Sequence, residues 1–494
     1  MIAFYAVLVP AIASLFILIF HRHPNIRESC TIIATFVTFI LVFLIAQEFL
    51  DGKSIECTIF EILPGIEFAF KVDAFGLIFA LTSSSLWILV SLYSIGYMRA
   101  LKEHAQTRYY FCFAISIMSA LGIAFSENLI TLFIFYETLT IVTYPLVSHE
   151  ESEEALVAGR KYLLYLMTSG SFLLAASLIT YAITGTTDFK PGGILNPMDE
   201  VLLKILFFFY ILGFMKAAYM PFHSWLPTAM IAPTPVSALL HAVAVVKAGV
   251  FGIIRVVCYI YGIDLIKYLN LDLILAVLAS FTVIVANLLA IGEDNFKRRL
   301  AYSTINQLSF IILGASLLSP LALMGAMMHI TFHGYMKITL FLCAGAIAVV
   351  TGKKLVSELS GVGKVMPITM IAFTIGAIGM AGLPPTAGFL GKLYICLGAV
   401  QSAETFAQPL LLSVILVVII ASILDIIYLL PIVISAFFEG SEGVKREEFR
   451  DVLCLFMVVS LSITAIFSIL LFIYPSVLLL PELAEVAANE VFKK

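Results

Sequence analysis

Long apolar runs separated by short polar segments alternate along the whole chain. An α-helix rises 1.5 Å per residue, so about 20 apolar residues are needed to cross the hydrocarbon core of a membrane. Many runs reach that length, and the pattern predicts an all-α polytopic membrane protein with about 14 spanning helices. We place these helices near residues 2–20, 31–50, 74–99, 110–126, 128–148, 161–184, 202–220, 235–260, 272–292, 299–318, 321–350, 366–401, 409–436 and 452–475.

Prolines interrupt two of the predicted helices, the seventh and the twelfth. Residues 366–401 are too many for one plain span and contain Leu-Pro-Pro at 383–385. The segment 202–231 is interrupted around Met220 and Pro221. Proline removes a backbone hydrogen bond that lipid cannot replace, so protein or water must cover each break.

Breaks at matching places in two halves often mark the transport site of a transporter built from inverted repeats. The two breaks lie five helices apart, which predicts two inverted five-helix repeats, helices 4–8 and helices 9–13. The chain then divides into N-terminal helices 1–3, the two repeats, and helix 14 with a short tail, over residues 1–109, 110–260, 272–436 and 437–494.

Basic residues gather on one side of this arrangement. If the N-terminus lies outside, alternate loops place sixteen Lys and Arg on the cytoplasmic side and six on the other. This bias predicts a multi-pass protein of the cell membrane with both termini outside, whose first apolar run stays in the membrane as a helix. The sixteen are Arg22, Arg27, Arg99, Lys102, Arg108, Arg160, Lys161, Lys297, Arg298, Arg299, Lys353, Lys354, Lys364, Lys445, Arg446 and Arg450. The six are Lys53, Lys71, Lys190, Lys267, Lys493 and Lys494.

Composition agrees with the membrane prediction and excludes several kinds of site. Apolar residues make up 62% of the chain and charged residues 12%, and the mean hydropathy of +1.08 is far above that of soluble proteins. The net charge of -4 is scattered, so we expect no nucleic-acid partner. The seven cysteines form no C-x-x-C pair, and no glycine-rich phosphate motif follows a strand pattern. We therefore expect no cofactor, nucleotide or metal site.

Six basic residues remain after the loops are counted. Lys204 and Arg255 are near helix ends, where long side chains can reach the membrane surface. The other four lie deep in apolar sequence, where a charge costs roughly 3 kcal/mol or more. They are therefore expected to face the interior of the helix bundle or a water-filled cavity. These four are Lys216, Lys247, Lys337 and Lys392.

Two isolated carboxylates lie in similarly apolar sequence. Glu137 is near the centre of the helix predicted over 128–148, and Asp425 is in the helix predicted over 409–436. We expect Glu137 to belong with the buried lysines, although a neighbour could simply satisfy it. Asp425 could join the same row or could only cap an unwound segment.

Three histidines add to the row. His329, His333 and Lys337 are spaced by four residues, which stacks them along one helix face. His241 precedes Lys247 by six residues, so the two point in different directions and could link successive positions of a path. Histidine, which titrates near neutral pH, suits the transfer of protons between lysines. His329 and His333 could also bind a metal, but no third ligand is near them in sequence.

Five segments resemble a known family over about residues 70–440. They are FYETLTIVTYPLVSH, GFMKAAYMPFHSWLPTAMIAPTPVSALLHAVAVVKAG, EDNFKRRLAYSTINQLSF, HITFHGYMKITLFLCAGAI and GLPPTAGFLGKLYI. Together they are similar to the antiporter-like subunits of respiratory complex I and to their relatives in Mrp-type sodium/proton antiporters and membrane-bound hydrogenases.

The resemblance implies a horizontal row of ion-translocating residues. Glu137 of the fifth helix would pair with Lys216 on the broken seventh helix. Lys247, with His241, would continue the path on the eighth helix. In the family this axis translocates ions in response to partner subunits.

The same resemblance assigns the second half of the row. His329, His333 and Lys337 would form the central relay, and Lys392, beside the break in the twelfth helix, would be the terminal exchange lysine. Asp425 stands where a neutral residue is expected. The segment KRRLAYST at the start of the tenth helix would be architectural.

The implied function is translocation of protons, or of sodium ions and protons, within a multisubunit complex. The partners would be other membrane subunits of a complex-I-like, hydrogenase or Mrp assembly, the lipid bilayer, H⁺ and Na⁺, and the chain itself would carry no redox chemistry.

The subfamily stays open, because two features of the sequence point in different directions. The short tail after helix 14 favours a middle complex I, D-type Mrp or hydrogenase relative, whereas MIAPTPVSALLHAVAVVKAG is closer to the A-type Mrp pattern. A stand-alone antiporter is the main alternative. No cofactor motif supports a quinone-binding enzyme, and the buried charges argue against a scaffold.

Overall fold

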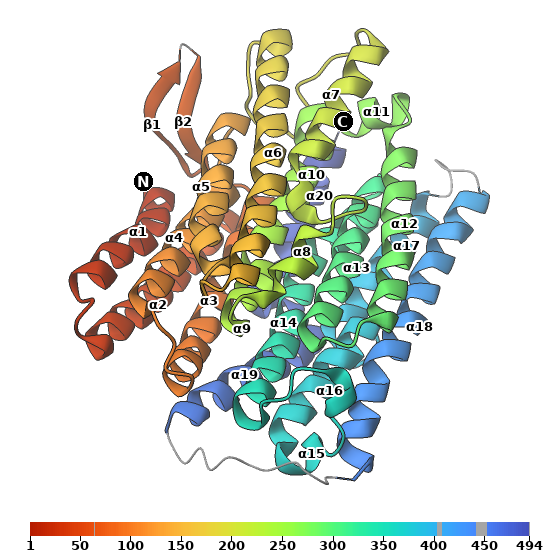
Figure 1. Ribbon diagram of the computed structural model, residues 1–494. Coiled ribbons are helices and arrows are strands. Elements are labelled where there is room, and N and C mark those ends of the chain that lie inside the picture. Colours follow the sequence, from red (N-terminus) through yellow and green to blue (C-terminus); the bar gives the residue numbers. More distant parts are fainter. Residues whose placement is uncertain (64, 403–407, 441–451, 494) are drawn as a thin grey trace.

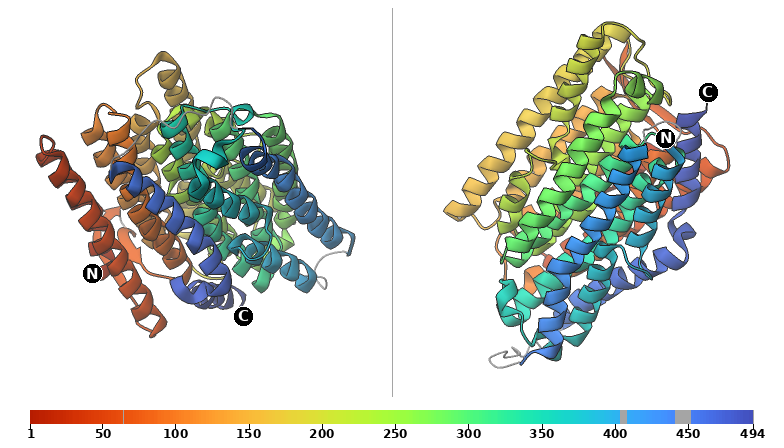
Figure 2. Two further views of the ribbon diagram at one scale, coloured as in Figure 1. Left: turned by 90° about the horizontal axis from the view of Figure 1, so that it is seen from below. Right: turned by 90° about the vertical axis from the view of Figure 1, so that its right-hand side faces the viewer.

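The computed structural model describes residues 1–63, 65–402, 408–440 and 452–493, and it is built almost entirely of helices (Figure 1). Most of the long helices run side by side, as the right-hand view of Figure 2 also shows. The helices are α1 (Ile2–Ile19), α2 (Pro24–Leu50), α3 (Ala74–Ala100), α4 (Gln106–Phe125), α5 (Leu129–Val147), α6 (Glu153–Thr184), α7 (Glu200–Gly213), α8 (Trp225–Thr228), α9 (Thr234–Ala238), α10 (Val245–Arg255), α11 (Ile263–Tyr268), α12 (Leu271–Gly292), α13 (Phe296–Ser316), α14 (Pro320–Thr351), α15 (Val362–Val365), α16 (Pro367–Ala381), α17 (Ala387–Gln401), α18 (Gln408–Phe438), α19 (Val452–Ile473) and α20 (Leu480–Phe492).

The predicted class, a helical multi-pass membrane protein, is confirmed. Ten helices in the described part of the chain are long and apolar enough to cross a membrane: α1 to α6, α12, α14, α18 and α19. The two most buried of these are α3 and α14, with 89% and 83% of their apolar windows inside the protein. The core of the bundle therefore surrounds α14, the helix with the His329, His333 and Lys337 spacing.

Both predicted helix breaks are present. After α7 ends at Gly213, a 3-10 turn at Met215–Ala217 and an irregular stretch precede α8. This break begins before Pro221, the residue that predicted it. The second break separates α16 from α17 at Gly382–Thr386, which contains Leu-Pro-Pro.

The helix predicted over 235–260 is not regular. It consists of α9, a π segment at Leu239–Val243, α10, and a second π segment at Val256–Tyr261. Ala244 separates the first π segment from α10 with φ -127° and ψ -68°. Such distortions leave backbone groups without regular helical partners, and they recur at functional sites.

Polar side chains fix the first turns of the helices that carry the predicted site. Asn128 caps α5 by accepting a hydrogen bond from the Thr131 amide at 2.8 Å. Asn295 and Ser319 cap α13 and α14 in the same way. Each cap satisfies an amide that would otherwise lack a partner inside the membrane protein, so it defines where the helix begins.

A strand hairpin and a helix that were not predicted lie at the end of the bundle where the termini meet. Strands β1 (Glu56–Leu63) and β2 (Ile66–Lys71) form an antiparallel hairpin, seen at the upper left of Figure 1. The Cys57 thiol on β1 lies 3.3 Å from the Met1 sulfur. The amphipathic helix α20 packs against α3 and α14 near the same end. Residues near both termini therefore lie at the same end of the bundle.

Candidate functional site

The four lysines that the sequence places in apolar helices are all buried. Lys216, Lys247 and Lys337 have no exposed surface, and Lys392 is 4% exposed. Lys216 lies in the 3-10 turn of the first break, and Lys392 lies on α17 just after the second break. A buried ammonium needs hydrogen-bond acceptors or a counter-charge, so the partners of these lysines define the site.

A line of close contacts runs from α10 to α18 through the middle of the bundle. Nζ of Lys247 lies 2.6 Å from Nδ1 of His333 on α14. The rings of His333 and His329, one turn apart on α14, are nearly parallel, with centroids 6.3 Å apart. Nε2 of His329 lies 3.0 Å from Oε1 of Gln307 on α13. Nε2 of Gln307 then donates a hydrogen bond to Oδ2 of Asp425 on α18 at 3.1 Å.

Asp425 is the point where this line meets Lys392. Its buried carboxylate forms an ion pair with Lys392, with 3.1 Å between Oδ2 and Nζ. Oδ1 also accepts hydrogen bonds from Asn306 at 2.9 Å and from the Tyr428 hydroxyl at 2.5 Å. Because α18 is continuous around Asp425, this residue does not cap an unwound segment. We call the series Lys247, His333, His329, Gln307, Asp425 and Lys392 the central line.

Lys392 also satisfies the backbone at the second helix break. Its ammonium donates to the Met380 carbonyl at 2.8 Å, in the last turn of α16, and to the Ser422 hydroxyl at 3.0 Å. Gln307 donates to the same Met380 carbonyl at 3.2 Å. Backbone amides after α16 satisfy the Ile378 and Gly379 carbonyls, and the side chains of Lys392 and Gln307 satisfy the Met380 carbonyl, so both kinds of hydrogen bond stabilise the break.

Lys337 lies beside the central line and bonds to a different helix. Its ammonium donates to the Ser303 hydroxyl and, at 3.3 Å, to the Leu300 carbonyl, both on α13. It also interacts electrostatically with Lys247 and with Asp425. The charge on Lys337 therefore acts on Lys247 at one end of the line and on Asp425 near the other.

Glu137 and Lys216 form a second cluster on α5 and the first break. The Lys216 ammonium donates to the Tyr136 carbonyl and lies 3.3 Å from the centroid of the Tyr136 ring. Lys216 and Glu137 interact electrostatically but form no direct ion pair, and neither Glu137 oxygen has a hydrogen-bond partner among the described residues. The carboxylate lies against Gly170 of α6, where an added Cβ would overlap Oε1.

The two clusters lie on segments that touch. Gly249 of α10 packs against the backbone of Lys216 and Ala217, where no larger residue would fit. Within the described part of the chain, no hydrogen bond joins Lys216 to Lys247. The side chain of His241, which was predicted to link them, lies outside the described residues.

The prediction that Arg255 reaches the membrane surface is wrong. Arg255 is 1% exposed and forms a two-pronged ion pair with Asp73, the residue that caps α3. A neighbour distant in sequence supplies the counter-charge that burial requires. Lys204, by contrast, is exposed as expected and pairs with Glu200 at 3.1 Å.

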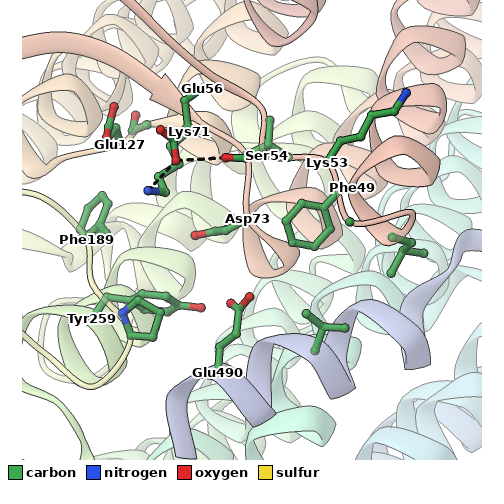
Figure 3. Close-up of a pocket in the computed structure, with 16 residues that line it drawn as sticks. Phe49, Lys53, Ser54, Glu56, Lys71, Asp73, Glu127, Phe189, Tyr259 and Glu490 are labelled. Carbon is green, nitrogen blue, oxygen red and sulfur yellow. Dashed lines mark hydrogen bonds and ion pairs between the residues drawn. The ribbon is translucent and has the colours of Figure 1, made fainter. Parts of the chain in front are cut away.

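Asp73 also lines a cavity of about 570 Å³ at the end of the bundle that carries the hairpin (Figure 3). Glu127 and Glu490 line the same cavity, and the Lys71–Glu56 ion pair of 2.7 Å lies on its wall. Burial raises the pKa of both Glu127 and Glu490. The residues that line this cavity include none of the predicted site residues.

Sequence reasoning missed the polar residues that connect the ionisable ones. Gln307 and Asn306 bond Asp425, and Ser303 bonds Lys337, all from α13. The available signal was the polar run Ser303–Gln307 inside a helix long enough to span the membrane. A polar stripe in a spanning helix is expected to face other polar groups.

Comparison with known sequences gives consistent relatives. The pattern of the family described as "NADH:quinone oxidoreductase/Mrp antiporter, TM" matches residues 126–436. Over 408 residues the chain is 31% identical to the A-type subunit of the Na(+)/H(+) antiporter of Alkalihalophilus pseudofirmus, covering 78% of this chain and 50% of that protein. It is 30% identical over 381 residues to the N-type subunit of the NADH-quinone oxidoreductase of Desulforudis audaxviator, covering 76% and 74% of the two chains. The chain thus spans about half the length of the antiporter relative.

Two solved structures share the fold. A chain of the membrane-bound sulfane sulfur reductase, an archaeal respiratory membrane complex, superposes with a TM-score of 0.84 at 24% identity, over 99% of this chain and 97% of that one. A chain of the Mrp complex from Dietzia sp. DQ12-45-1b superposes with a TM-score of 0.79 at 20% identity, over 100% and 96%. The overall fold is therefore common to all three chains.

Proposed function

This chain belongs to the NADH:quinone oxidoreductase/Mrp antiporter family, and on that premise we propose that it is an ion-translocating subunit of a membrane complex. It moves protons, or protons in exchange for sodium ions, along buried ionisable residues, while partner subunits supply the driving force. The proposed path uses Glu137, Lys216, His241, Lys247, His329, His333, Lys337, Lys392 and Asp425.

The central line is the observation that carries this proposal. Ionisable side chains from α10, α14, α17 and α18 follow one another at hydrogen-bond or ring-stacking distance, with Gln307 of α13 as a bridge. Buried ionisable groups are costly in a membrane protein, and transport pathways are the sites that use them. A purely structural role would not require neighbouring buried groups of this kind to be continuous.

Changes in pairing provide a mechanism for coupling. Two unit charges about 7 Å apart interact by roughly 2 kcal/mol at an effective dielectric constant near 20. Moving one charge across 100 mV costs about 2.3 kcal/mol, which is a similar free energy. A partner protein that changes the charge state of Glu137 would therefore change the proton affinity of Lys216, and Lys247 would respond next along the touching segments.

The chemistry of the central line favours protons over sodium ions. Lysine and histidine nitrogens carry a proton when charged, and an ammonium repels a metal cation. Hard metal cations prefer a cage of oxygen ligands, and Asp425 is the only carboxylate among the residues that define this line. Any sodium coupling would then act outside the line.

The partners and orientation form part of the same proposal. The named relatives are subunits, and the matching structures are complexes, which supports assembly with other membrane subunits. The excess of basic residues in alternate loops supports both termini on the outside of the cell membrane. A reporter fused after Lys354 is therefore expected to lie in the cytoplasm, and an outside signal would reverse the orientation.

Reconstitution of the complex into sealed vesicles tests the function. With the driving reaction supplied, the wild type should build a proton gradient, with and without Na⁺. Glu137→Ala, Lys216→Ala and Lys337→Met should assemble but build almost none. Undiminished pumping in these variants would contradict the path. Full activity of the purified chain alone would favour the stand-alone antiporter.

A further inference from the structure

We propose that Glu103, His104 and His149 bind a divalent transition-metal ion, with Zn²⁺ as the best fit. Glu103 and His104 lie in the turn between α3 and α4, and His149 follows the end of α5. One ligand atom from each residue lies within 4.8 Å of the other two. This cluster shares no residue with the proposed ion path and does not depend on it.

His149 is the strongest indication of a ligand. Its side chain is completely buried, and neither ring nitrogen has a hydrogen-bond partner of good geometry among the described residues, although the backbone of His104 interacts with the ring. Nε2 is 3.7 Å from Oε2 of Glu103, which is beyond hydrogen-bond length. A buried polar group without a partner is costly, so such a group needs an explanation. A metal ion bonded to Nε2 would satisfy this nitrogen.

The other two ligands can reach the same point. The His104 and His149 rings stack with centroids 4.8 Å apart and an angle of 28° between planes. Nδ1 of His104 is 4.0 Å from Oε2 of Glu103. Ligand atoms about 2.0–2.1 Å from a tetrahedral Zn²⁺ are separated by roughly 3.4 Å. The shifts required are therefore small, and His104 is exposed at the surface of the protein.

The ligand types select the metal. Two imidazoles and one carboxylate suit Zn²⁺ and its neighbours, whereas Mg²⁺ and Ca²⁺ prefer oxygen ligands alone. Glu151 adds negative charge, with Oε1 3.9 Å from Nε2 of His104. Arg108 offsets part of this negative charge, because it forms an ion pair with Glu151 and donates a hydrogen bond to the His149 carbonyl at 3.3 Å. Water or Glu151 would complete the coordination.

Metal binding here would clamp the α3–α4 turn to the end of α5. Glu137 lies on α5 about three helical turns before His149, so the clamp would also restrain the helix that carries it. Glu103 and His104 are adjacent, but His149 is distant from them along the chain, so local sequence spacing did not reveal the site.

A Co²⁺ titration tests the proposal directly. The protein is purified with a tag that contains no histidine, stripped of metal, and titrated with Co²⁺ while its visible d–d absorption is recorded. We expect one Co²⁺ per chain, displaced by Zn²⁺. His149→Gln should remove the signal, and Glu103→Gln or His104→Gln should each weaken affinity at least about tenfold.

His21 and His23 provide the matched control, because both are exposed histidines close together in sequence. The double variant His21→Gln/His23→Gln should bind Co²⁺ like the wild type. Loss of binding in this control would overturn the proposal by placing the metal on the surface pair. If His149→Gln does not fold, the variant His104→Gln tests the proposal instead, because His104 is exposed and its substitution should not affect folding. An unchanged Co²⁺ affinity in His104→Gln would also overturn the proposal.

Discussion

Lys392 and Asp425 form a buried ion pair that joins a broken helix to a continuous one. Lys392 lies at the start of α17 and also bonds the Met380 carbonyl at the end of α16. Asp425 lies within α18 and receives four hydrogen bonds, from Lys392, Gln307, Asn306 and Tyr428. A change in the charge of either partner would therefore act on the break and on the central line together.

The first prediction concerns Asp425→Asn. Asparagine keeps the shape of the side chain but removes the counter-charge of Lys392, so proton transport by the assembled complex should fall at least about tenfold. Removing one partner of a buried pair costs about 3–5 kcal/mol, so the melting temperature should also fall. The matched control is Glu439→Gln, an exposed carboxylate just after the same helix, which should leave both unchanged. Transport at the wild-type rate in Asp425→Asn would exclude this pair from the path.

The second prediction tests whether Gln307 is needed for proton transfer along the central line or only stabilises Asp425. Gln307 links His329 to Asp425, whereas Asn306 bonds Asp425 alone. Gln307→Leu should stop most proton transport because it opens a gap in the line, and Asn306→Leu should reduce transport much less. Both remove a buried hydrogen bond to a charged group, so both should destabilise by about 1.5–3 kcal/mol. Equal transport rates in the two variants would show that Gln307 is only a support.

The third prediction uses the close packing of Glu137. A methyl group at Gly170 would overlap its carboxylate, so Gly170→Ala must displace Glu137 from its place near Lys216. Because a displacement of about 1 Å can cost a hundredfold in rate at a reaction site, we expect transport to fall tenfold or more. Gly292→Ala is the control, since a Cβ there meets nothing within 4 Å. Proton-gradient measurements on both complexes check this, and normal transport in Gly170→Ala would show that the position of Glu137 is not critical.

The apolar pattern of the sequence predicts well which residues are buried. It predicts much less well which residues contact one another. Burial of the four lysines follows from the length of the apolar runs around them, and the structure confirms it. The partner of Arg255 could not be predicted, because Asp73 lies 182 residues away and the packing of α3 against α10, as between Phe75 and Phe251, brings them together. The Gln307–Asp425 contact, 118 residues apart, was missed for the same reason. The hairpin was missed because its two short strands follow the period of a sheet in a chain dominated by helices.

The last prediction concerns pH and the cavity at the termini. Burial and the nearby Asp73 carboxylate raise the pKa of Glu490 in the folded protein above the value of about 4.5 expected for the unfolded chain. The folded state therefore binds more protons than the unfolded state above about pH 4.5, so the contribution of Glu490 to stability is present at low pH and is lost as pH rises through the folded pKa.

Glu490→Gln removes the charge but keeps the shape. The variant should melt at a higher temperature than the wild type near pH 8, and the difference should vanish near pH 4. Glu485→Gln, an exposed position on the same helix, should show no such change between the two pH values in the same calorimetric measurement. A Glu490→Gln protein that is less stable than the wild type near pH 8 would mean that attraction to Arg255, Lys493 and Lys71 outweighs burial, and that this carboxylate is a stabilising partner in the cavity wall.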